Sequence, residues 1–265
     1  MKIPRLPLVI TLLTISYSAL AESPAPKLLI SEDFESTPVG EIPKGFTKSG
    51  PLAVAEDFAH SGKKSLRLEP IAKGARTITR QGPEIAALGG QFWGRLYFKV
   101  KLPTPLPVIP EGKTTAAIHT TLVSGKATSP LFNDPIETRM MGTSTNTAGT
   151  FSWLYNVQPR GGRKEFGVGT KTKYQYTDEW TLAEWSVDNT TQSYRFFIDG
   201  REVTEIAVNK GAGQFEGAEL PASYENLTFG WLNYQAATEP GFTVWIDDLA
   251  LSKERIGPVA TTPKK

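Results

Sequence analysis

Hydrophobic and polar residues alternate with a period of two in the stretch from Glu184 to Val203. Within it, Tyr194, Phe196 and Ile198 share one face of an extended chain, and the residues between them share the other. This period is typical of a β-strand and not of a helix. We expect Trp185 to join Phe196 and Ile198 in the core.

Two turn sequences divide this stretch into segments. D-N-T-T stands at 188–191 and D-G at 199–200. The D-G pair is among the strongest signals for a two-residue β-hairpin turn. The stretch therefore predicts two antiparallel strands and the start of a third.

Similar alternation predicts further strands before and after this hairpin. They lie at 28–34, 65–68, 96–101, 115–122, 138–141, 151–157, 227–235 and 244–251. The segment 102–112 carries four prolines and is predicted to be a loop. The small polar residues at 143–150 predict a loop or lid. A turn near 84–88 is the one helical signal, so the predicted fold is all-β.

Two strands have faces that bear on function. In 115–122, Ile118 and Leu122 share an apolar face, which places His119 on the opposite face. In 151–157, the aromatic residues Trp153 and Tyr155 share a face. We interpret this aromatic face as an exposed surface on which sugar rings can stack.

The first 21 residues have the features of a secretory signal peptide. Lys2 and Arg5 precede an apolar run from Leu8 to Leu20, and Ala19-Leu20-Ala21 is a small-x-small cleavage site. We therefore expect a secreted or periplasmic protein. The predicted organisation is a signal peptide at 1–21, a leader at 22–29, a single domain at 30–258 and a C-terminal tail at 259–265.

Composition excludes several classes of protein. The 265 residues include 29 basic and 27 acidic ones, and the sequence has no basic block. We therefore expect no binding to nucleic acid and, after signal cleavage, none to a membrane. The chain has no cysteine, which excludes disulfides, cysteine nucleophiles and thiolate metal sites. The chain is long enough to bury a sizeable core as one domain. We expect a monomer.

An ordered set of short motifs carries a family resemblance. The motifs are F-E at 34–35, A-H-S-G at 59–62, F-W-G-R at 92–95, a histidine strand, E-T-R-M-M-G at 137–142, Y-N at 155–156, E-W at 184–185, D-G at 199–200, F-G-W-L-N-Y at 229–234 and W-I-D-D-L at 245–249. This order resembles the secreted jelly-roll proteins that cellulolytic fungi express with their cellulases, and their bacterial relatives. It is more distantly similar to glucuronan and alginate lyases. The resemblance implies a concanavalin-like β-jelly roll of two stacked antiparallel sheets.

The resemblance also implies a structural calcium ion. In that family the ion lies between the first and last strands, and the matching residues here are Glu35, Ser61 and Asp247. Calcium prefers several oxygen ligands, and carboxylates that converge from separate strands otherwise repel each other. The alternative is that these acids are solvated residues at strand ends. No cofactor is expected for the chemistry itself.

A second implied site lies on the concave face and would cleave a uronate-containing glycan by β-elimination. A base removes the proton α to the uronate carboxylate while an arginine neutralises that carboxylate. The motifs give Arg139 as the carboxylate clamp, His119 as the base, and Tyr155 or Tyr234 as the acid.

Further residues are predicted to contact the polysaccharide. Asn156 would assist the clamp, Arg95 would add a substrate contact, and Trp153 and Trp231 would stack on sugar rings. Glu137 lies beside the predicted clamp, and an acid there weakens the case for an anionic substrate.

Two functions therefore stay open at the level of sequence. One is a polysaccharide lyase, and the other is a non-catalytic glycan-binding protein on the same scaffold. Hydrolysis by a retaining glycosidase is not supported, because the chain has no E-x-D-x-x-E run to hold two carboxylates at the separation that reaction needs.

Overall fold

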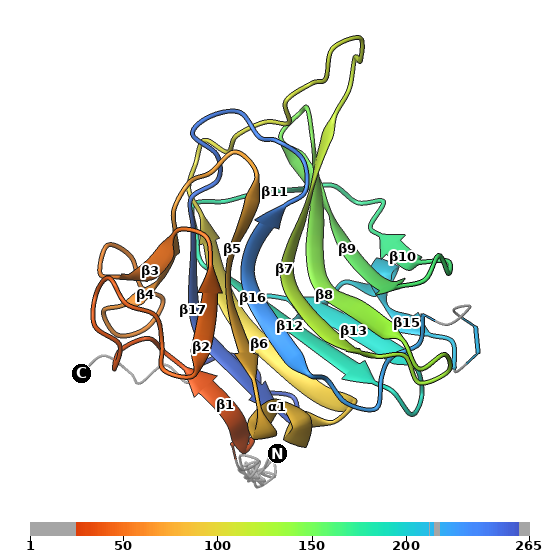
Figure 1. Ribbon diagram of the computed structural model, residues 1–265. Coiled ribbons are helices and arrows are strands. Elements are labelled where there is room, and N and C mark those ends of the chain that lie inside the picture. Colours follow the sequence, from red (N-terminus) through yellow and green to blue (C-terminus); the bar gives the residue numbers. More distant parts are fainter. Residues whose placement is uncertain (1–24, 212, 215–217, 260–265) are drawn as a thin grey trace, which may run out of the picture.

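The computed structural model describes residues 25–211, 213–214 and 218–259 (Figure 1). The predicted signal peptide at 1–21 and most of the predicted tail lie outside the described residues. Within the described part of the chain, no helix is long and apolar enough to cross a membrane.

The fold consists of two stacked antiparallel β-sheets, as the jelly-roll prediction requires. The nine-stranded sheet, here called sheet A, has the order β14-β13-β12-β6-β17-β4-β3, with β1 beside β17 and β15 beside β13. Its strands are β1 (Leu28–Glu32), β3 (Leu52–Ala55), β4 (Ser65–Leu68), β6 (Gln91–Val100), β12 (Thr181–Asp188), β13 (Ser193–Ile198), β14 (Arg201–Glu202), β15 (Val208–Asn209) and β17 (Val244–Ser252).

The eight-stranded sheet, here called sheet B, has the order β10-β9-β8-β7-β16-β5-β2, with β11 beside β9. Its strands are β2 (Phe46–Ser49), β5 (Gly74–Gln81), β7 (Ala117–Thr128), β8 (Pro135–Asn146), β9 (Thr150–Pro159), β10 (Phe166–Gly169), β11 (Tyr174–Gln175) and β16 (Asn226–Asn233). In Figure 1 sheet B lies in front of sheet A. Helix is confined in the described residues to α1 (Pro83–Leu88) and the 3₁₀ turn η1 (Thr204–Ile206).

The hairpin predicted from the alternating pattern is present as β12, β13 and β14. Trp185 pairs with Phe196 across β12 and β13. Both side chains are fully buried, and Ile198 is partly buried against the same core. The turn between β13 and β14 places Asp199 and Gly200 at φ values of 48° and 76°. Glycine and aspartate adopt this left-handed conformation at low cost, so the D-G signal has its expected structural basis.

Aromatic side chains from both sheets meet in the core. The ring of Trp153 on β9 lies 4.9 Å from that of Phe196 on β13 and 6.0 Å from that of Phe98 on β6. Because β6 and β13 belong to sheet A and β9 to sheet B, these rings bridge the two layers. Such edge-to-face pairs stabilise a core beyond the burial of their area.

The first strand begins at Leu28, as predicted, and ends at Glu32, two residues before its predicted end. One predicted loop differs from the structure. The segment 143–150, predicted to be a loop or lid, instead continues β8 as far as Asn146 before a short turn. Thr143 and Thr145 are fully buried there, and both hydroxyls bond the hydroxyl of Tyr176, at 3.0 and 3.2 Å. Threonine suits a strand when its hydroxyl finds a partner, which explains the error.

Candidate functional site

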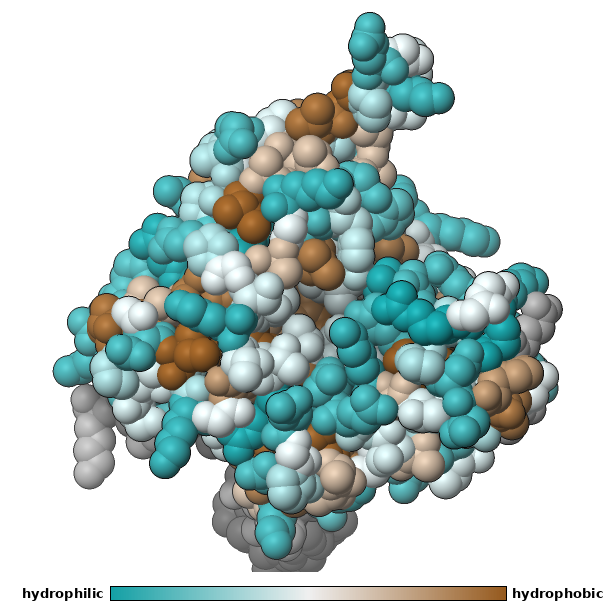
Figure 2. Space-filling model, viewed as in Figure 1, coloured by the Kyte–Doolittle hydropathy of each residue, from teal (hydrophilic) through white to brown (hydrophobic). Residues whose placement is uncertain are grey.

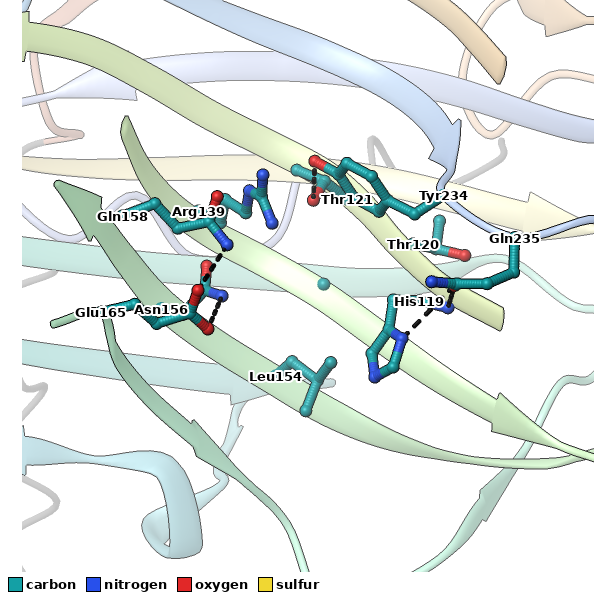
Figure 3. Close-up of a pocket in the computed structure, with 11 residues that line it drawn as sticks. His119, Thr120, Thr121, Arg139, Leu154, Asn156, Gln158, Glu165, Tyr234 and Gln235 are labelled. Atoms are coloured by element: carbon teal, nitrogen blue, oxygen red, sulfur yellow. Dashed lines mark hydrogen bonds between the residues drawn. The ribbon is translucent and has the colours of Figure 1, made fainter. Parts of the chain in front are cut away.

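A groove of about 390 Å³ crosses the outer face of sheet B (Figure 3). Its walls come from β7, β8, β9 and the chain segments that follow β9 and β16. The residues that line it are His119, Thr120, Thr121, Arg139, Gly142, Leu154, Asn156, Gln158, Glu165, Tyr234 and Gln235. Figure 3 shows His119, Arg139 and Tyr234 arranged around one hollow.

Local irregularities in three neighbouring strand pairs shape this groove. The register shifts between Arg139 and Gly142 in β8 and β9, near Thr121 in β7, and between Phe229 and Leu232 in β16. At the first shift, Met140 and Met141 are both fully buried although they are consecutive. A β-bulge allows this arrangement and redirects nearby side chains. It lets Arg139 face the groove while two methionines fill the core.

The guanidinium of Arg139 lies over the ring of Tyr234, with its central carbon 4.5 Å from the ring centroid. One edge of the guanidinium, Nε and Nη2, donates to Oε2 of Glu137 at 3.3 and 3.1 Å. Nη1 takes no part in this ion pair. The pair is only partly exposed, so it is less screened than a surface ion pair. Glu137 therefore orients Arg139 and occupies one edge of its guanidinium group.

The hydroxyl of Tyr234 lies 3.2 Å from the hydroxyl of Thr121. Burial raises the pKa of Tyr234, while the bond to Thr121 and the charge of Arg139 partly oppose that rise and Glu137 adds to it. A phenol with a raised pKa stays protonated at neutral pH and can donate a proton. Tyr234 therefore has a proton to donate, although its raised pKa makes it a weaker acid than an ordinary tyrosine.

The side chain of His119 is exposed in the groove and is oriented by Gln235. The backbone N–H of His119 donates to Oε1 of Gln235 at 2.7 Å, and Nδ1 of the imidazole lies 3.3 Å from the same oxygen. Because an amide oxygen only accepts hydrogen bonds, Nδ1 carries the proton in this contact. The lone pair of the neutral imidazole is then on Nε2, which can act as a base.

Amide and carboxyl groups form the wall opposite Tyr234. Asn156 lies directly across from Arg139 in the β8–β9 register. Its Nδ2 donates to Glu165 at 3.3 Å, and Nε2 of Gln158 donates to the other oxygen of Glu165 at 2.8 Å. Oδ1 of Asn156 is buried without a hydrogen-bond partner among the described residues. This wall offers groups that can bond sugar hydroxyls.

A second hollow of about 440 Å³ adjoins the groove and shares Tyr234 and Gln235 with it. Val108 lines this hollow, and Leu106 and Ile109 beside it are also exposed. Figure 2 shows apolar side chains gathered where the loop between β6 and β7 rises from this face. Backbone hydrogen bonds from Val108 to Ala236 and from Thr238 to Leu106 hold the loop in place. The groove therefore continues past Tyr234 along an apolar wall.

Three aromatic residues predicted to face the substrate are instead part of the core. Trp153 and Tyr155 are each 2% exposed, and Trp231 is fully buried. The ring of Tyr155 stacks on that of Tyr194 at 3.8 Å, and burial raises its pKa well above the ordinary value. Strand alternation explains the correction, because the outward positions of β9 are those of Leu154, Asn156 and Gln158. These three predictions, as stacking platform and as acid, are wrong.

Arg95 is not part of the groove either. It lies on β6 of sheet A, whereas the groove is on sheet B. Its Nε donates to the carbonyl of Asp248 and its Nη1 to the carbonyl of Gly257. The side chain is almost completely buried under the C-terminal segment. Arg95 therefore anchors the chain end, and its predicted substrate contact is wrong.

Seven groove-lining residues were not predicted as site residues from the sequence: Thr120, Thr121, Gly142, Leu154, Gln158, Glu165 and Gln235. Leu154 and Gln158 each lie two residues from Asn156 on β9, so they share its face of the strand. Strand alternation could therefore have identified both. Glu165 and Gln235 lie in segments outside the predicted strands or at their ends, and their positions depend on the turns that follow β9 and β16.

Two of the three predicted calcium ligands, Glu35 and Asp247, bind the loop that contains the third, Ser61. Oε1 of Glu35 accepts from the backbone amides of Lys63 and Lys64, and Oδ2 of Asp247 accepts from those of His60 and Ser61. The two acids therefore hold the loop through its N–H groups. Among the described residues, no group of three or more histidine, cysteine, aspartate or glutamate side chains could hold a metal ion. Calcium stays a prediction, and no chemical step depends on it.

If calcium binds at these residues, addition of a chelator should lower the melting temperature, and excess calcium should restore it, because a ligand bound only to the folded state stabilises that state. Thermal melts of the wild type and of Asp247→Ala, with chelator and with calcium, measure this. A melting temperature that is unchanged in the wild type under all conditions would exclude the ion.

No protein-family model and no curated protein sequence matches the chain. Solved structures do match it in fold. The cellulose-induced protein Cip1 is 15% identical, with a TM-score of 0.53 over 87% of this chain and 100% of that one. The endo-β-1,4-glucuronan lyase from the fungus Trichoderma reesei is 12% identical, with a TM-score of 0.52 over 86% and 96%.

A carbohydrate esterase from the Shiga toxin-encoding bacteriophage phi24B is 17% identical, with a TM-score of 0.50 over 88% of this chain and 100% of that one. Identities this low establish a shared fold and not a shared activity. The predicted resemblance to the cellulose-induced proteins is confirmed at that level: the chain has the jelly-roll fold of Cip1 and of glucuronan lyase.

Proposed function

We propose that this protein binds a uronate-containing polysaccharide in the groove on sheet B and cleaves it by β-elimination. The observation that carries the proposal is the combination of an arginine, a tyrosine and a histidine in that groove. The guanidinium of Arg139 lies over the ring of Tyr234, and His119 faces the same hollow from β7 (Figure 3).

Arg139 is assigned to the uronate carboxylate. Its edge through Nε is engaged by Glu137, which leaves Nη1 to donate to the substrate. A charge-assisted hydrogen bond to the carboxylate spreads its negative charge and makes the neighbouring C–H proton more acidic. Because Glu137 and Tyr234 hold the guanidinium, little reorganisation is needed when the substrate binds.

His119 is assigned as the base and Tyr234 as the acid. Nε2 of the neutral imidazole accepts the proton α to the carboxylate, and the electron pair of that C–H bond becomes the new C=C bond. The bond to the glycosidic oxygen breaks, and that oxygen takes the proton of the Tyr234 hydroxyl. The products are a shortened chain and an unsaturated uronate whose double bond is conjugated with its carboxylate.

One finding and one sequence prediction support this proposal. A protein of the same fold is an endo-β-1,4-glucuronan lyase, so the scaffold is compatible with this chemistry. The predicted signal peptide would bring the protein to an extracellular or periplasmic polysaccharide.

A glycan-binding function without chemistry is the alternative, and the charges in the groove favour it. Arg139 is already paired with Glu137, and Glu165 adds a second acid to the opposite wall. Asn156, Gln158 and Glu165 form the kind of hydrogen-bonding wall that binds neutral sugar hydroxyls. Such a site would hold a glycan without needing a uronate.

An absorbance assay separates the two functions, because only elimination creates the conjugated product. Polyglucuronate, alginate and polygalacturonate serve as substrates, and each polymer with its carboxyl groups reduced serves as a matched control. We expect ultraviolet absorbance to rise with at least one native uronan and not with its reduced form. Binding of a polymer in calorimetry, with no rise in absorbance for any uronan, would instead establish the glycan-binding function.

A further inference from the structure

The hollow of about 440 Å³ that adjoins the groove has no role in the cleavage as described so far. It shares Tyr234 and Gln235 with the groove, so a sugar chain bound in the groove can continue into it without a break. Its volume lies within the range of sites that bind small molecules. Among the described residues that line this hollow, Lys73 is the only charged one.

Lys73 directly precedes β5 and is held beside the segment that follows β16. Gly74, the first residue of β5, pairs with Asn233, the last residue of β16. The carbonyl of Ala72 accepts a hydrogen bond from the backbone N–H of Ala237 at 2.8 Å. The backbone of Lys73 is therefore fixed on both sides, and its side chain has a defined origin at the wall of the hollow.

The positive charge of Lys73 is not compensated by a neighbouring acid. Lys73 is exposed, and its ammonium group has no ion pair or hydrogen bond with any residue that the structure describes. The groove differs, because Arg139 is paired there with Glu137, and Glu165 lines the opposite wall. An uncompensated positive charge in a hollow favours an anionic guest.

The opposite wall of the hollow is apolar. Val108 and Pro110 line it, and Val108 is 47% exposed beside Ile109, which is 45% exposed. Exposed apolar side chains that lie next to each other and are rimmed by polar groups are typical of binding surfaces. A uronate matches both walls, because its ring has a face of C–H groups and a carboxylate at its edge.

The proposed cleavage determines which sugar reaches this hollow. Tyr234 gives its proton to the oxygen that joins the cleaved uronate to the departing sugar, so Tyr234 must lie between these two sugars. The cleaved uronate is bound by Arg139, which lines the groove and not the hollow. The hollow begins at Tyr234 and extends away from the groove, so it is the place of the departing sugar.

We propose that Lys73 binds the carboxylate of the departing sugar and makes the hollow selective for a second uronate. The preferred substrate is then a run of consecutive uronates, and not a chain in which every uronate is joined to a neutral sugar. Because Arg139 and Tyr234 have their roles only in the proposed cleavage, the place of the departing sugar rests on that function. Lys73 does not touch the reacting atoms, so it acts on substrate binding.

Steady-state kinetics on polyglucuronate give the first test. Lys73→Gln removes the charge, and we expect KM to rise about twofold to fivefold, the range of one exposed ion pair. We expect kcat to stay unchanged, because a contact that is equal in the ground state and the transition state affects binding alone. Lys73→Arg keeps the charge and should resemble the wild type. Lys48→Gln is the matched control, because Lys48 is exposed on β2 of the same sheet and lines neither the groove nor the hollow.

Calorimetry tests Lys73 independently of cleavage. A six-residue oligoglucuronate is titrated into His119→Ala protein, alone and combined with Lys73→Gln, Lys73→Arg or Lys48→Gln. We expect Lys73→Gln to weaken binding about twofold to fivefold and the other two to leave it unchanged. The loss should shrink as sodium chloride is raised, because salt screens an exposed charge pair.

These measurements distinguish a wrong role for Lys73 from a wrong function. The role is overturned if Lys73→Gln binds the oligomer as tightly as Lys48→Gln, or if Lys73→Arg loses as much affinity as Lys73→Gln. If no uronan yields an unsaturated product while Lys73→Gln still weakens binding, cleavage is wrong and Lys73 is a uronate contact of a glycan-binding site. Absence of any oligoglucuronate binding would overturn both.

Discussion

His119→Ala is expected to lower the rate of uronan cleavage by about 10²- to 10⁴-fold, the range typical of a lost general base. The imidazole is exposed in the groove and has its Nδ1 against Gln235, so Nε2 is the nitrogen that accepts the proton. Initial rates from the absorbance assay measure the loss. His60→Ala is the matched control, because His60 is the chain's other histidine and contacts Asp248 instead of the groove.

Arg139→Lys and Tyr234→Phe test the remaining assignments at the same site. Lysine keeps the positive charge but cannot reproduce the planar fork that both pairs with Glu137 and lies over Tyr234. We expect a large loss of kcat/KM, whereas Arg195→Lys, in an exposed pair with Glu202, should cleave like the wild type. Tyr234→Phe removes the proton donor and keeps the ring beneath the guanidinium.

The pH profile distinguishes the base from the acid. A general base acts only in its unprotonated form, so the rate of elimination should rise with pH to a plateau. Tyr234 acts in its protonated form, so the rate should fall as the phenol ionises. Because burial raises the pKa of Tyr234, that fall should lie above the range ordinary for a tyrosine. Loss of the falling limb in Tyr234→Phe would support its role, and an unchanged rate and profile would contradict it.

These outcomes also separate the lyase from the alternative function. A glycan-binding protein would give no unsaturated product with any variant. It would lose affinity when Asn156 or Gln158 is replaced by alanine, because those amides line the wall that can bond sugar hydroxyls. Full lyase activity in His119→Ala would refute the assignment of the base while leaving elimination itself in place.

The groove shows how far strand alternation predicts a site. Alternation places His119 on the face of β7 opposite to Ile118 and Leu122. In the structure His119 is exposed, and Ile118 and Leu122 are buried. On β9 the same rule shows that Trp153 and Tyr155 share a face, but alternation does not say which face is inside. An aromatic face suits both a sugar-binding surface and a core. The opposite face, with Asn156 and Gln158, was the more polar one and indicated the correct orientation.

Other features of the groove depend on contacts between strands that are distant in sequence. The bulge at Met140 and Met141 requires two residues on β8 to oppose one position on β9, and a single strand's sequence does not specify that. Arg95 shows the same limit. The F-W-G-R motif identifies the residue, but only the order of the strands in the fold determines that it lies on sheet A. Thr143 was wrongly predicted to lie in a loop. Its hydroxyl contacts the hydroxyl of Tyr176, which is 33 residues away, and the local sequence does not reveal such a contact.

Phe196→Ala is expected to destabilise the protein by roughly 3–5 kcal/mol, the loss typical of a buried aromatic residue truncated to alanine. Phe196 is fully buried, lies opposite Trp185 on β12 and meets the ring of Trp153 across the sandwich at 4.9 Å. Truncation would remove buried area and leave a cavity between the two sheets. A urea titration measures the loss. The slope of the unfolding free energy against urea concentration should stay unchanged.

Phe132→Ala is the matched control for this measurement. Phe132 is 50% exposed in the loop between β7 and β8, where its ring contacts the guanidinium of Arg163 at 4.2 Å. Its truncation should cost less than about 1 kcal/mol, the scale of an exposed cation–π contact. A cost below about 1 kcal/mol for Phe196→Ala as well, the size typical of surface changes, would mean that the two faces of β13 are inverted. The inward position of Trp153 would then be wrong too, because the contact between the rings of Trp153 and Phe196 orients both residues.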